Sequence, residues 1–373
     1  MKIGVAKEIK NNENRVALTP AGVDRLKSQG HQVMIEKSAG LGSALPDEAY
    51  LKAGATIAPD AATVWAKNDM VLKVKEPLSS EWPHMRKGQT LFTYLHLAAD
   101  RALTEGVVKT GSYCFAYETL EHNHGLPLLT PMSEVAGRMA IQAGAKFLEA
   151  PAGGSGILLG GVPGVRPAKV LIIGGGVVGT QAARMAAGLG AEVTILDVNL
   201  DRMRYLDEIL PKNCRTVYST PHAVREALPE TDLVVGAILI PGAAAPKLIK
   251  REDLKLMRKG SVIVDVAVDQ GGCIETVHAT THAEPTYVID GVIHYCVANM
   301  PGAVPRTSTL ALTNATLPWV ERLAKLGPIA AVEASAELRT AANVLGGKIT
   351  YEAVAQAFDM QYVPALEAAK SLH

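Results

Sequence analysis

Three glycines at a fixed spacing form the first pattern in this sequence that points to chemistry. Gly174, Gly176 and Gly179 follow a short apolar run, residues 170–173, and they open an Ala-rich stretch that predicts a helix. In such a unit the first glycine allows a tight turn, the second lets the backbone approach a pyrophosphate, and the third lets the helix pack close to the strand. The free N–H groups and positive dipole end of the helix would hold the phosphates. The spacing therefore predicts a dinucleotide site.

A carboxylate stands where such a unit contacts the adenosine ribose. A second apolar run, residues 193–196, ends on Asp197. Its carboxylate would accept hydrogen bonds from the ribose hydroxyls and would repel a 2′-phosphate, so NAD is favoured over NADP. The alternative is an ordinary strand–helix–strand unit that binds no nucleotide. The strand, the glycines, the helix, the second strand and the acid fall in register, which favours the dinucleotide.

Asp269 is a second acidic candidate. Residues 261–268 predict a buried strand, and Asp269 follows directly. A carboxylate at the tip of a buried strand is costly unless something there uses it, so we expect a functional role, with a structural one as the alternative.

The first third of the chain offers a cation pair and an imidazole. Arg15 lies in the loop after a predicted strand at the N-terminus. Lys75 follows the apolar run of residues 70–74, and His96 follows that of residues 90–95. A guanidinium matches a carboxylate in bidentate fashion, and an imidazole suits general acid–base chemistry near neutral pH. Each has a plainer alternative. Arg15 could be a surface residue that pairs with Glu8 or Glu13, the lysine could be solvated, and the histidine could belong to the core.

The order of predicted elements indicates the fold. Apolar strands alternate with helical patterns in both halves of the chain, which predicts two Rossmann-like, doubly wound α/β domains. We expect a substrate domain made of residues 1–130 and 305–373, and therefore discontinuous in sequence, and a dinucleotide-binding domain of residues 131–304. Helical patterns in residues 333–373 suggest that the tail packs onto the first domain.

Composition narrows the class of protein. The chain has 373 residues, with 37 basic side chains balanced by 37 acidic ones. This balance argues against binding to nucleic acid or to a charged membrane surface. The four cysteines are scattered without a metal or disulfide pattern, and no apolar run is long enough to cross a bilayer. We expect a soluble protein of the cytoplasm.

Seven stretches taken in order closely resemble the L-alanine dehydrogenase family along nearly the whole chain. They are K-E-I-K-N-N-E-N-R-V-A-L-T-P, L-K-V-K-E-P, L-F-T-Y-L-H-L-A-A-D, P-M-S-E-V-A-G-R-M-A, G-G-G-V-V-G, V-D-V-A-V-D-Q-G-G and Y-C-V-A-N-M-P-G-A-V-P. The resemblance implies NAD-dependent oxidation of L-alanine to pyruvate and ammonium, usually by a homohexamer.

The resemblance also implies roles for individual residues. Arg15 would bind the substrate carboxylate, Lys75 would contact the carbonyl or carboxylate, and His96 and Asp269 would be the acid–base groups. Besides the three glycines, the implied cofactor contacts are Ser133, Val177, Val178, Asp197, Arg202, Ser219, Ile238, Leu239, Val266, Ala267, Val268, Asp269, Val297, Ala298, Asn299 and Met300.

The sequence departs from some relatives at two points. Where they carry an arginine near the adenosine, this chain has His278. Some relatives bind magnesium through a glutamate like Glu118 and a histidine near the end of a long helix. That histidine is missing here, so we predict no metal.

Two other functions stay open. The first is the soluble subunit of a nicotinamide nucleotide transhydrogenase, whose first domain resembles this one. The second is a non-catalytic NAD-binding protein, against which the full set of candidate residues argues.

Overall fold

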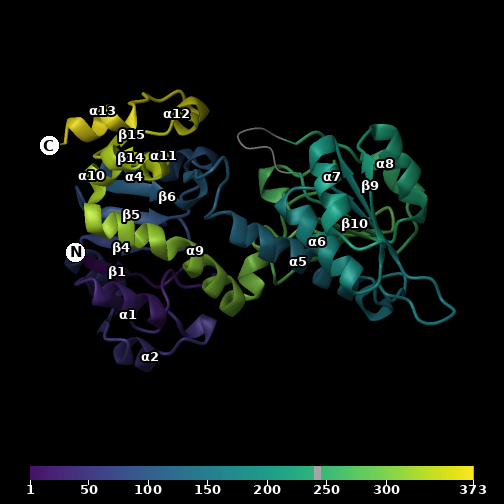
Figure 1. The fold of residues 1–373 in the computed structure, drawn as a ribbon, viewed down its shortest axis with the longest axis horizontal. Helices are drawn as coiled ribbons and strands as arrows, with labels where there is room; N and C mark the ends of the chain where they lie inside the picture. The colour runs from purple at the N-terminus through teal and green to yellow at the C-terminus, as the bar shows by residue number, and fades with distance from the viewer. Residues whose placement is uncertain (239–244, 373) are drawn as a thin grey trace. The chain divides into compact units, whose positions relative to one another are not determined.

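The chain folds into two compact α/β units. A computed structural model describes residues 1–238 and 245–372. The first unit combines Met1–Met132 with Val304–His373, and the second is Ser133–Ala303 (Figure 1). Each unit is built on one largely parallel sheet, which confirms the predicted fold class and the discontinuous first part.

The sheet of the first unit has eight strands in the order β15-β14-β6-β5-β4-β1-β2-β3. Strands β1 to β6 run parallel to one another, β14 pairs antiparallel with β6, and β15 pairs antiparallel with β14. The strands are β1 (Lys2–Val5), β2 (Gln32–Glu36), β3 (Thr56–Ala58), β4 (Met70–Leu72), β5 (Thr90–Thr93), β6 (Tyr113–Ala116), β14 (Ala342–Leu345) and β15 (Lys348–Ile349).

Helices cover this sheet and follow local sequence signals. The first, α1, begins as its sequence predicts, because Thr19 accepts from the amide of Gly22 and Pro20 occupies the first turn. The helices are α1 (Pro20–Ser28), α2 (Asp47–Lys52), α3 (Ala61–Lys67), α4 (Arg101–Thr110), α9 (Pro305–Leu326), α10 (Pro328–Ala334), α11 (Ala336–Ala341), α12 (Glu352–Phe358) and α13 (Ala365–Lys370).

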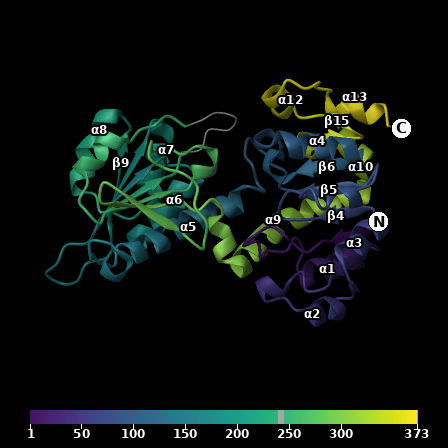
Figure 2. The same cartoon turned by 180° about the vertical axis from the view of Figure 1, so that it is seen from behind.

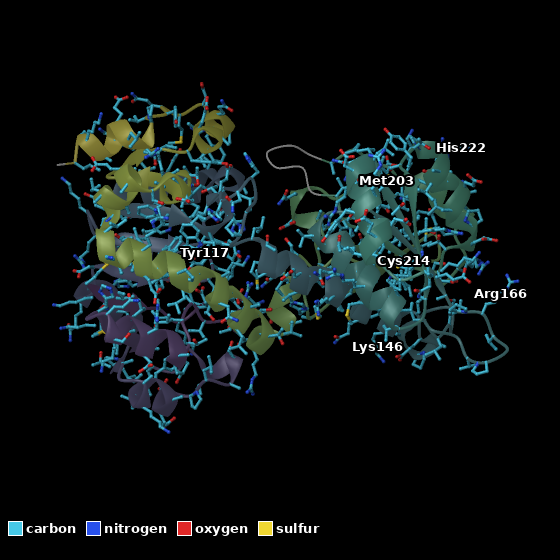
Figure 3. All side chains as sticks on the ribbon, viewed as in Figure 1. Tyr117, Lys146, Arg166, Met203, Cys214 and His222 are labelled. Carbon is cyan, nitrogen blue, oxygen red and sulfur yellow. The ribbon has the colours of Figure 1, made fainter. Side chains whose placement is uncertain are left out.

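An aromatic cluster lies in the core of the same unit. Tyr117 is fully buried there against Phe92 and Tyr94 (Figure 3).

The tail corrects one expectation. Its pattern predicts helices alone, but the tail also supplies β14, which pairs antiparallel with β6 and extends the sheet. Helices α12 and α13 pack beside β15 and β14, as both views show (Figure 2). A segment of four buried residues next to helical patterns is too short to be distinguished from a helix in sequence, because its pairing with the edge of β6 defines the strand.

The sheet of the second unit has seven strands in the order β12-β13-β11-β10-β7-β8-β9, with only β12 antiparallel. The strands are β7 (Lys169–Ile173), β8 (Glu192–Asp197), β9 (Cys214–Tyr218), β10 (Leu233–Gly236), β11 (Val262–Asp265), β12 (Thr286–Ile289) and β13 (Val292–Tyr295). The helices are α5 (Thr130–Phe147), which starts at the end of the first unit's first segment, α6 (Val177–Gly188), α7 (Leu200–Ile209) and α8 (Pro221–Ala227).

Alternate side chains of β7 enter two different cores. Val170 and Ile172 pack with the alanines of α6, whereas Leu171 and Ile173 pack with Val224 of α8. A strand buried on both faces explains the uninterrupted apolar run before the glycines.

One predicted strand is too long. The sheet ladder of β11 stops at Asp265 instead of residue 268, because the Asp265 side chain turns back to accept from the amide of Ala267. Residues Val268–Gln270 then form a short 3₁₀ helix, η8.

Two further observations concern the described residues. None of their helices is both long and apolar enough to span a membrane. All four cysteines are free thiols.

Candidate active site

Four neighbouring strands bring the candidates of the first unit to one edge of its sheet. The strands β6, β5, β4 and β1 lie side by side, and Glu118, His96, Lys75 and Arg15 follow their carboxyl ends in that order. Ligands of parallel sheets bind at this edge. The strand order therefore places the predicted residues Arg15, Lys75 and His96 at the same edge of the sheet, which the sequence alone does not show.

Arg15 is a buried residue and not the surface residue of the alternative interpretation. Only 2% of it is exposed, and its guanidinium grips Glu13 with Nε–Oε1 and Nη2–Oε2 distances of 2.7 and 2.5 Å. Its third nitrogen lies 3.0 Å from the sulfur of Met132. Burial would raise the pKa of Glu13, but the hydrogen bonds from Arg15 outweigh it and lower that pKa. The pair holds a buried guanidinium, a group that can bind carboxylates, in the loop after β1.

Lys75 follows β4 and is held by its backbone. Glu8 accepts from the amides of Val74 at 2.6 Å and Lys75 at 3.3 Å. Burial, and then the charge of Arg15, lowers the pKa of the Lys75 ammonium. The preceding Lys73 is fully buried between Glu8 and Glu81, at 3.2 and 2.9 Å, and therefore serves the framework.

His96 is exposed, which excludes the core histidine of the alternative interpretation. Its side chain is 42% exposed, and its backbone takes the left-handed conformation with φ of 51°. Glu118 accepts from the amides of both Leu95 and His96, at 3.1 and 2.6 Å. A non-glycine residue held at positive φ costs free energy and is common at functional sites. The carboxylate of Glu118 thus holds the backbone of His96 in this conformation.

The carboxylate of Glu76 lies beside the His96 imidazole. Its Oε2 lies 3.5 Å from Nδ1 of His96, an ion-pair distance, and its Oε1 accepts from Lys10. Burial would raise the pKa of Glu76, but His96 and Lys10 lower it to about 2. The carboxylate is thus ionised at neutral pH, and it favours the tautomer with the proton on Nδ1 and an open Nε2.

Of the carboxylates at this edge, Glu8, Glu13, Glu76 and Glu118, the sequence suggested the first two only as surface partners of Arg15 and the last only as the counterpart of a magnesium ligand, and Glu76 was missed. A signal was present, since the first three stand inside the motifs that carry Arg15 and Lys75. Their amide contacts, however, join residues far apart along the chain.

The glycine turn of the second unit has the predicted geometry. Gly174 has φ of +105°, which side chains rarely adopt, and a Cβ on Gly179 would lie 1.8 Å from the carbonyl oxygen of Gly174. A Cβ on Gly176 would meet nothing within 4 Å. The backbone conformation and packing of the protein therefore require Gly174 and Gly179, whereas Gly176 leaves open space at the start of α6.

This open space fits a dinucleotide. No side chain caps α6, Val177 is 39% exposed, and Val178 is partly exposed. Asp197 accepts from the amides of Gly175 and Asn199, at 2.7 and 2.8 Å, which sets its carboxylate beside the turn. Unpaired helix N–H groups bind phosphate, and a carboxylate here binds ribose hydroxyls. The residues present therefore suit NAD.

Arg202 braces the same turn. Its Nε donates to the carbonyl of Gly175 and its Nη2 to Thr180, both at 2.7 Å. The next predicted contact, Ser219, donates its amide to the carbonyl of Asp197.

The other predicted cofactor residues gather at loops after the strands of this sheet. Ile238 follows β10, residues 266–269 follow β11, and residues 297–300 follow β13, whereas Leu239 lies outside the described residues. Ser133 is on α5, whose Gly137 packs on the backbone of Val178 in α6. His278 is exposed and stacks on Tyr287, with ring centroids 3.8 Å apart.

Asp265, and not Asp269, is the carboxylate at the tip of the buried strand. Asp269 is exposed in η8, whereas Asp265 at the tip of β11 has no exposed surface. Burial raises the pKa of Asp265 to about 6. The predicted strand extended to residue 268, so the cost of burying a carboxylate was assigned to Asp269 instead of Asp265.

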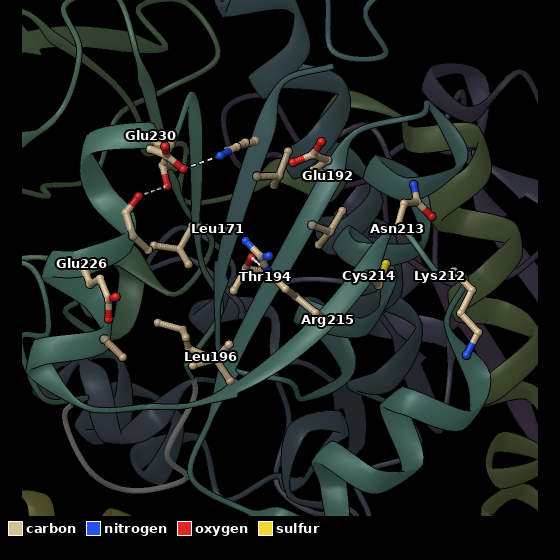
Figure 4. Close-up of a pocket in the computed structure, with 17 residues that line it drawn as sticks. Leu171, Glu192, Thr194, Leu196, Lys212, Asn213, Cys214, Arg215, Glu226 and Glu230 are labelled. Carbon is tan, nitrogen blue, oxygen red and sulfur yellow. Dashed lines mark hydrogen bonds and ion pairs between the residues drawn. The ribbon is translucent and has the colours of Figure 1, made fainter. Parts of the chain in front are cut away.

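One pocket of the second unit lies apart from these residues. It measures about 760 Å³ and lies between α8 and the face of β7, β8 and β9 that points away from α6 (Figure 4). Lys169 and Glu230, which form an ion pair, both line it, and no predicted site residue does. Among the described residues, no group of three or more His, Cys, Asp and Glu side chains could hold a metal ion. The predicted absence of a metal stays a prediction.

Comparison with known proteins agrees with this geometry. Residues 4–136 match the family "Alanine dehydrogenase/PNT, N-terminal domain", and residues 140–352 match its C-terminal domain. The alanine dehydrogenase of Bacillus subtilis (strain 168) is 58% identical over 99% of this chain and 97% of its own length.

The chain belongs to the alanine dehydrogenase/PNT family.

Solved structures of this family extend the comparison. An L-alanine dehydrogenase superposes with a TM-score of 0.94 at 52% identity, covering 96% of this chain and 99% of that one. A transhydrogenase from Sinorhizobium meliloti reaches a TM-score of 0.81 at 28% identity, covering 95% and 100%. Within the family, the chain is thus more similar to these alanine dehydrogenases than to this transhydrogenase.

A pair of glycine variants tests the nucleotide cradle. We expect Gly176→Ala to keep the wild-type Tm but to weaken NADH binding by roughly tenfold, about 1.4 kcal/mol, because its methyl group enters only the open space. Gly179→Ala should instead lower the free energy of unfolding by about 1–3 kcal/mol, because its methyl group overlaps Gly174. NADH fluorescence titration and thermal unfolding separate the two. Equal NADH affinity in Gly176→Ala and wild type would place the nucleotide elsewhere.

A pair of charge variants tests the environment of His96. Glu76→Gln removes the anion that lies 3.5 Å from Nδ1 of His96 and would stabilise an imidazolium formed during catalysis, so kcat should fall by about tenfold. Lys10→Gln leaves the Glu76 carboxylate in place, so its kcat should stay within about threefold of wild type. Equal kcat in Glu76→Gln and wild type would show that Glu76 has no electrostatic effect on His96.

Proposed function

We propose that this chain oxidises L-alanine to pyruvate and ammonium with NAD, and that it also catalyses the reverse reductive amination. The observation that carries the proposal is the 58% identity to a curated alanine dehydrogenase over nearly the whole length of both chains. The buried arginine, the lysine and the presented histidine at one sheet edge support it. When bound, NAD supplies the hydride acceptor.

We assign the substrate to the first unit and the dinucleotide to the second. Arg15, held in place by Glu13, would bind the substrate carboxylate. Lys75 would contact the carboxylate or the carbonyl oxygen, and its lowered pKa lets the ammonium release a proton more readily than an ordinary lysine. Fixing the carboxylate at two cations orients Cα for hydride removal.

His96 and Asp269 would carry the protons. Oxidation of the amine requires proton loss from nitrogen and addition of water to the imine carbon, and Nε2 of His96 would accept and return these protons. Ionised Glu76 at Nδ1 stabilises the imidazolium that forms. We propose Asp269 as the second acid–base group.

The cofactor contacts form a second set of assignments. The first-turn amides at Val177 and Val178 would hold the pyrophosphate, and Asp197 would bind the adenosine ribose and select NAD over NADP. Arg202 and Ser219 would support this end. We place the nicotinamide half at Ser133, Ile238, Leu239, Val266, Ala267, Val268, Asp269, Val297, Ala298, Asn299 and Met300.

A pair of variants tests these roles. We expect His96→Ala and Asp269→Asn each to lower kcat for NAD reduction with L-alanine by about 10²–10⁴-fold, while NADH affinity stays within about threefold. Full activity in both variants would reject the assignment. NADH–NADP exchange without alanine turnover would indicate a transhydrogenase subunit, and NADH binding without turnover of any amino acid would indicate a non-catalytic protein.

We further propose a homohexamer, as the family resemblance implies, and a location in the cytoplasm, as the composition and the scattered cysteines indicate. Light scattering should then give six times the chain mass of 39.4 kDa. A mass of one or two chains at micromolar concentration would contradict it.

A further inference from the structure

Asp265 holds both ends of one loop. Its Oδ1 accepts from the amide of Ala267, and its Oδ2 accepts from the amide of Cys273, each at 3.0 Å. The carboxylate lies at the tip of β11 with no exposed surface. The residues between these two amides include η8 with Asp269.

The protein leaves exact room for this carboxylate. A Cβ on Gly236 of β10 would lie 2.9 Å from Oδ2, and one on Gly272 would lie 2.5 Å from it. Two stretches of backbone therefore approach the carboxylate more closely than any residue with a side chain would permit.

Lys247 closes the loop from outside. Its ammonium donates to the carbonyls of Gly271, Gly272 and Ile274, the last two at 3.0 and 3.2 Å. The loop is thus fixed through its amides by a buried anion and through its carbonyls by an exposed cation.

We infer that Asp265 is a positioning residue that sets the place of Asp269 by anchoring residues 266–273. The inference rests on the proposed function, because it gives the anchored loop a catalytic purpose. A displacement of about 1 Å in a reacting group can cost 10²-fold in rate, so a loop clamped at both ends has a direct kinetic value.

The charges around Asp265 define the state in which it anchors. Lys247 favours its ionised form and Asp269 disfavours it, while Cys273, Cys296 and Tyr287 interact electrostatically with it. With a pKa of about 6, the carboxylate is ionised at pH 7 and above, where both oxygens accept. A protonated acid or an amide would turn a donor toward one of the two N–H groups.

Asp265→Asn is therefore the decisive variant, with Asp232→Asn as its matched control. Asp232 is also buried in the second unit and accepts from the amide of Lys169 at 2.9 Å, but it lies at the amino end of the sheet. We expect Asp265→Asn to lower kcat by about 10–100-fold with NADH affinity within threefold. Asp232→Asn should lower Tm with kcat within about twofold.

Amide hydrogen exchange gives a readout that does not depend on the reaction. In Asp265→Asn, peptides covering residues 266–273 should exchange at least tenfold faster than in wild type, while those of Asp232→Asn should not change. If wild type lacks alanine turnover, the proposed function fails but this exchange result still tests the anchor. Unchanged exchange, or faster exchange with full kcat, would overturn the inference.

Lys247→Met provides a second variant in case Asp265→Asn does not fold. Its side chain is exposed, so the fold should persist while the outer clamp is lost. We expect a smaller fall in kcat, about threefold to tenfold, with faster exchange of the same peptides. Wild-type values for both would contradict the role of the clamped loop.

Discussion

Acidic side chains that accept backbone N–H groups beyond the carboxyl ends of parallel strands are the interaction on which this structure depends. Glu8 holds the amide of Val74, and Glu118 holds that of His96. In the second unit Asp197 holds Gly175, and Asp265 holds Cys273. A parallel sheet ends in loops whose amides lack ladder partners, and these acids supply acceptors of higher strength than a neutral group would. The loops that carry Lys75, His96, the glycine turn and Asp269 are thereby fixed to the sheets.

These buried acids lower the stability of the fold, but they fix the positions of the loops that carry the candidate residues. Burial raises the pKa of Asp265 from 3.8 to about 6, so keeping it ionised costs the fold about 3 kcal/mol. Burial likewise raises the pKa of Glu8, despite the attraction of Lys73. His96 adds a backbone conformation that is unfavourable for a side chain. Anchors of this kind suit a reaction whose reacting atoms must be placed within fractions of an ångström.

The sequence predicted those features of the site that depend on residues close together in the chain. The glycine turn and Asp197 could be identified because one strand, one turn and one helix determine them. Non-local contacts could not be identified: Glu8 meets Val74 across 66 positions, and Glu118 meets His96 across 22. These contacts depend on the strand order, in which β6, β5, β4 and β1 are neighbours. Asp265 was missed because hydropathy does not show where a strand ends, and the antiparallel β14 was missed because only its partner's edge defines it.

Native-state hydrogen exchange, resolved to single amides in the wild-type protein, tests this account most directly. The amides of Val74, His96, Gly175 and Cys273 lie outside the strands, yet each donates to a carboxylate. We expect their protection to match that of amides in the adjoining strands. Exchange as fast as at Gly164, which lies in a loop, would show that the carboxylates do not fix these loops.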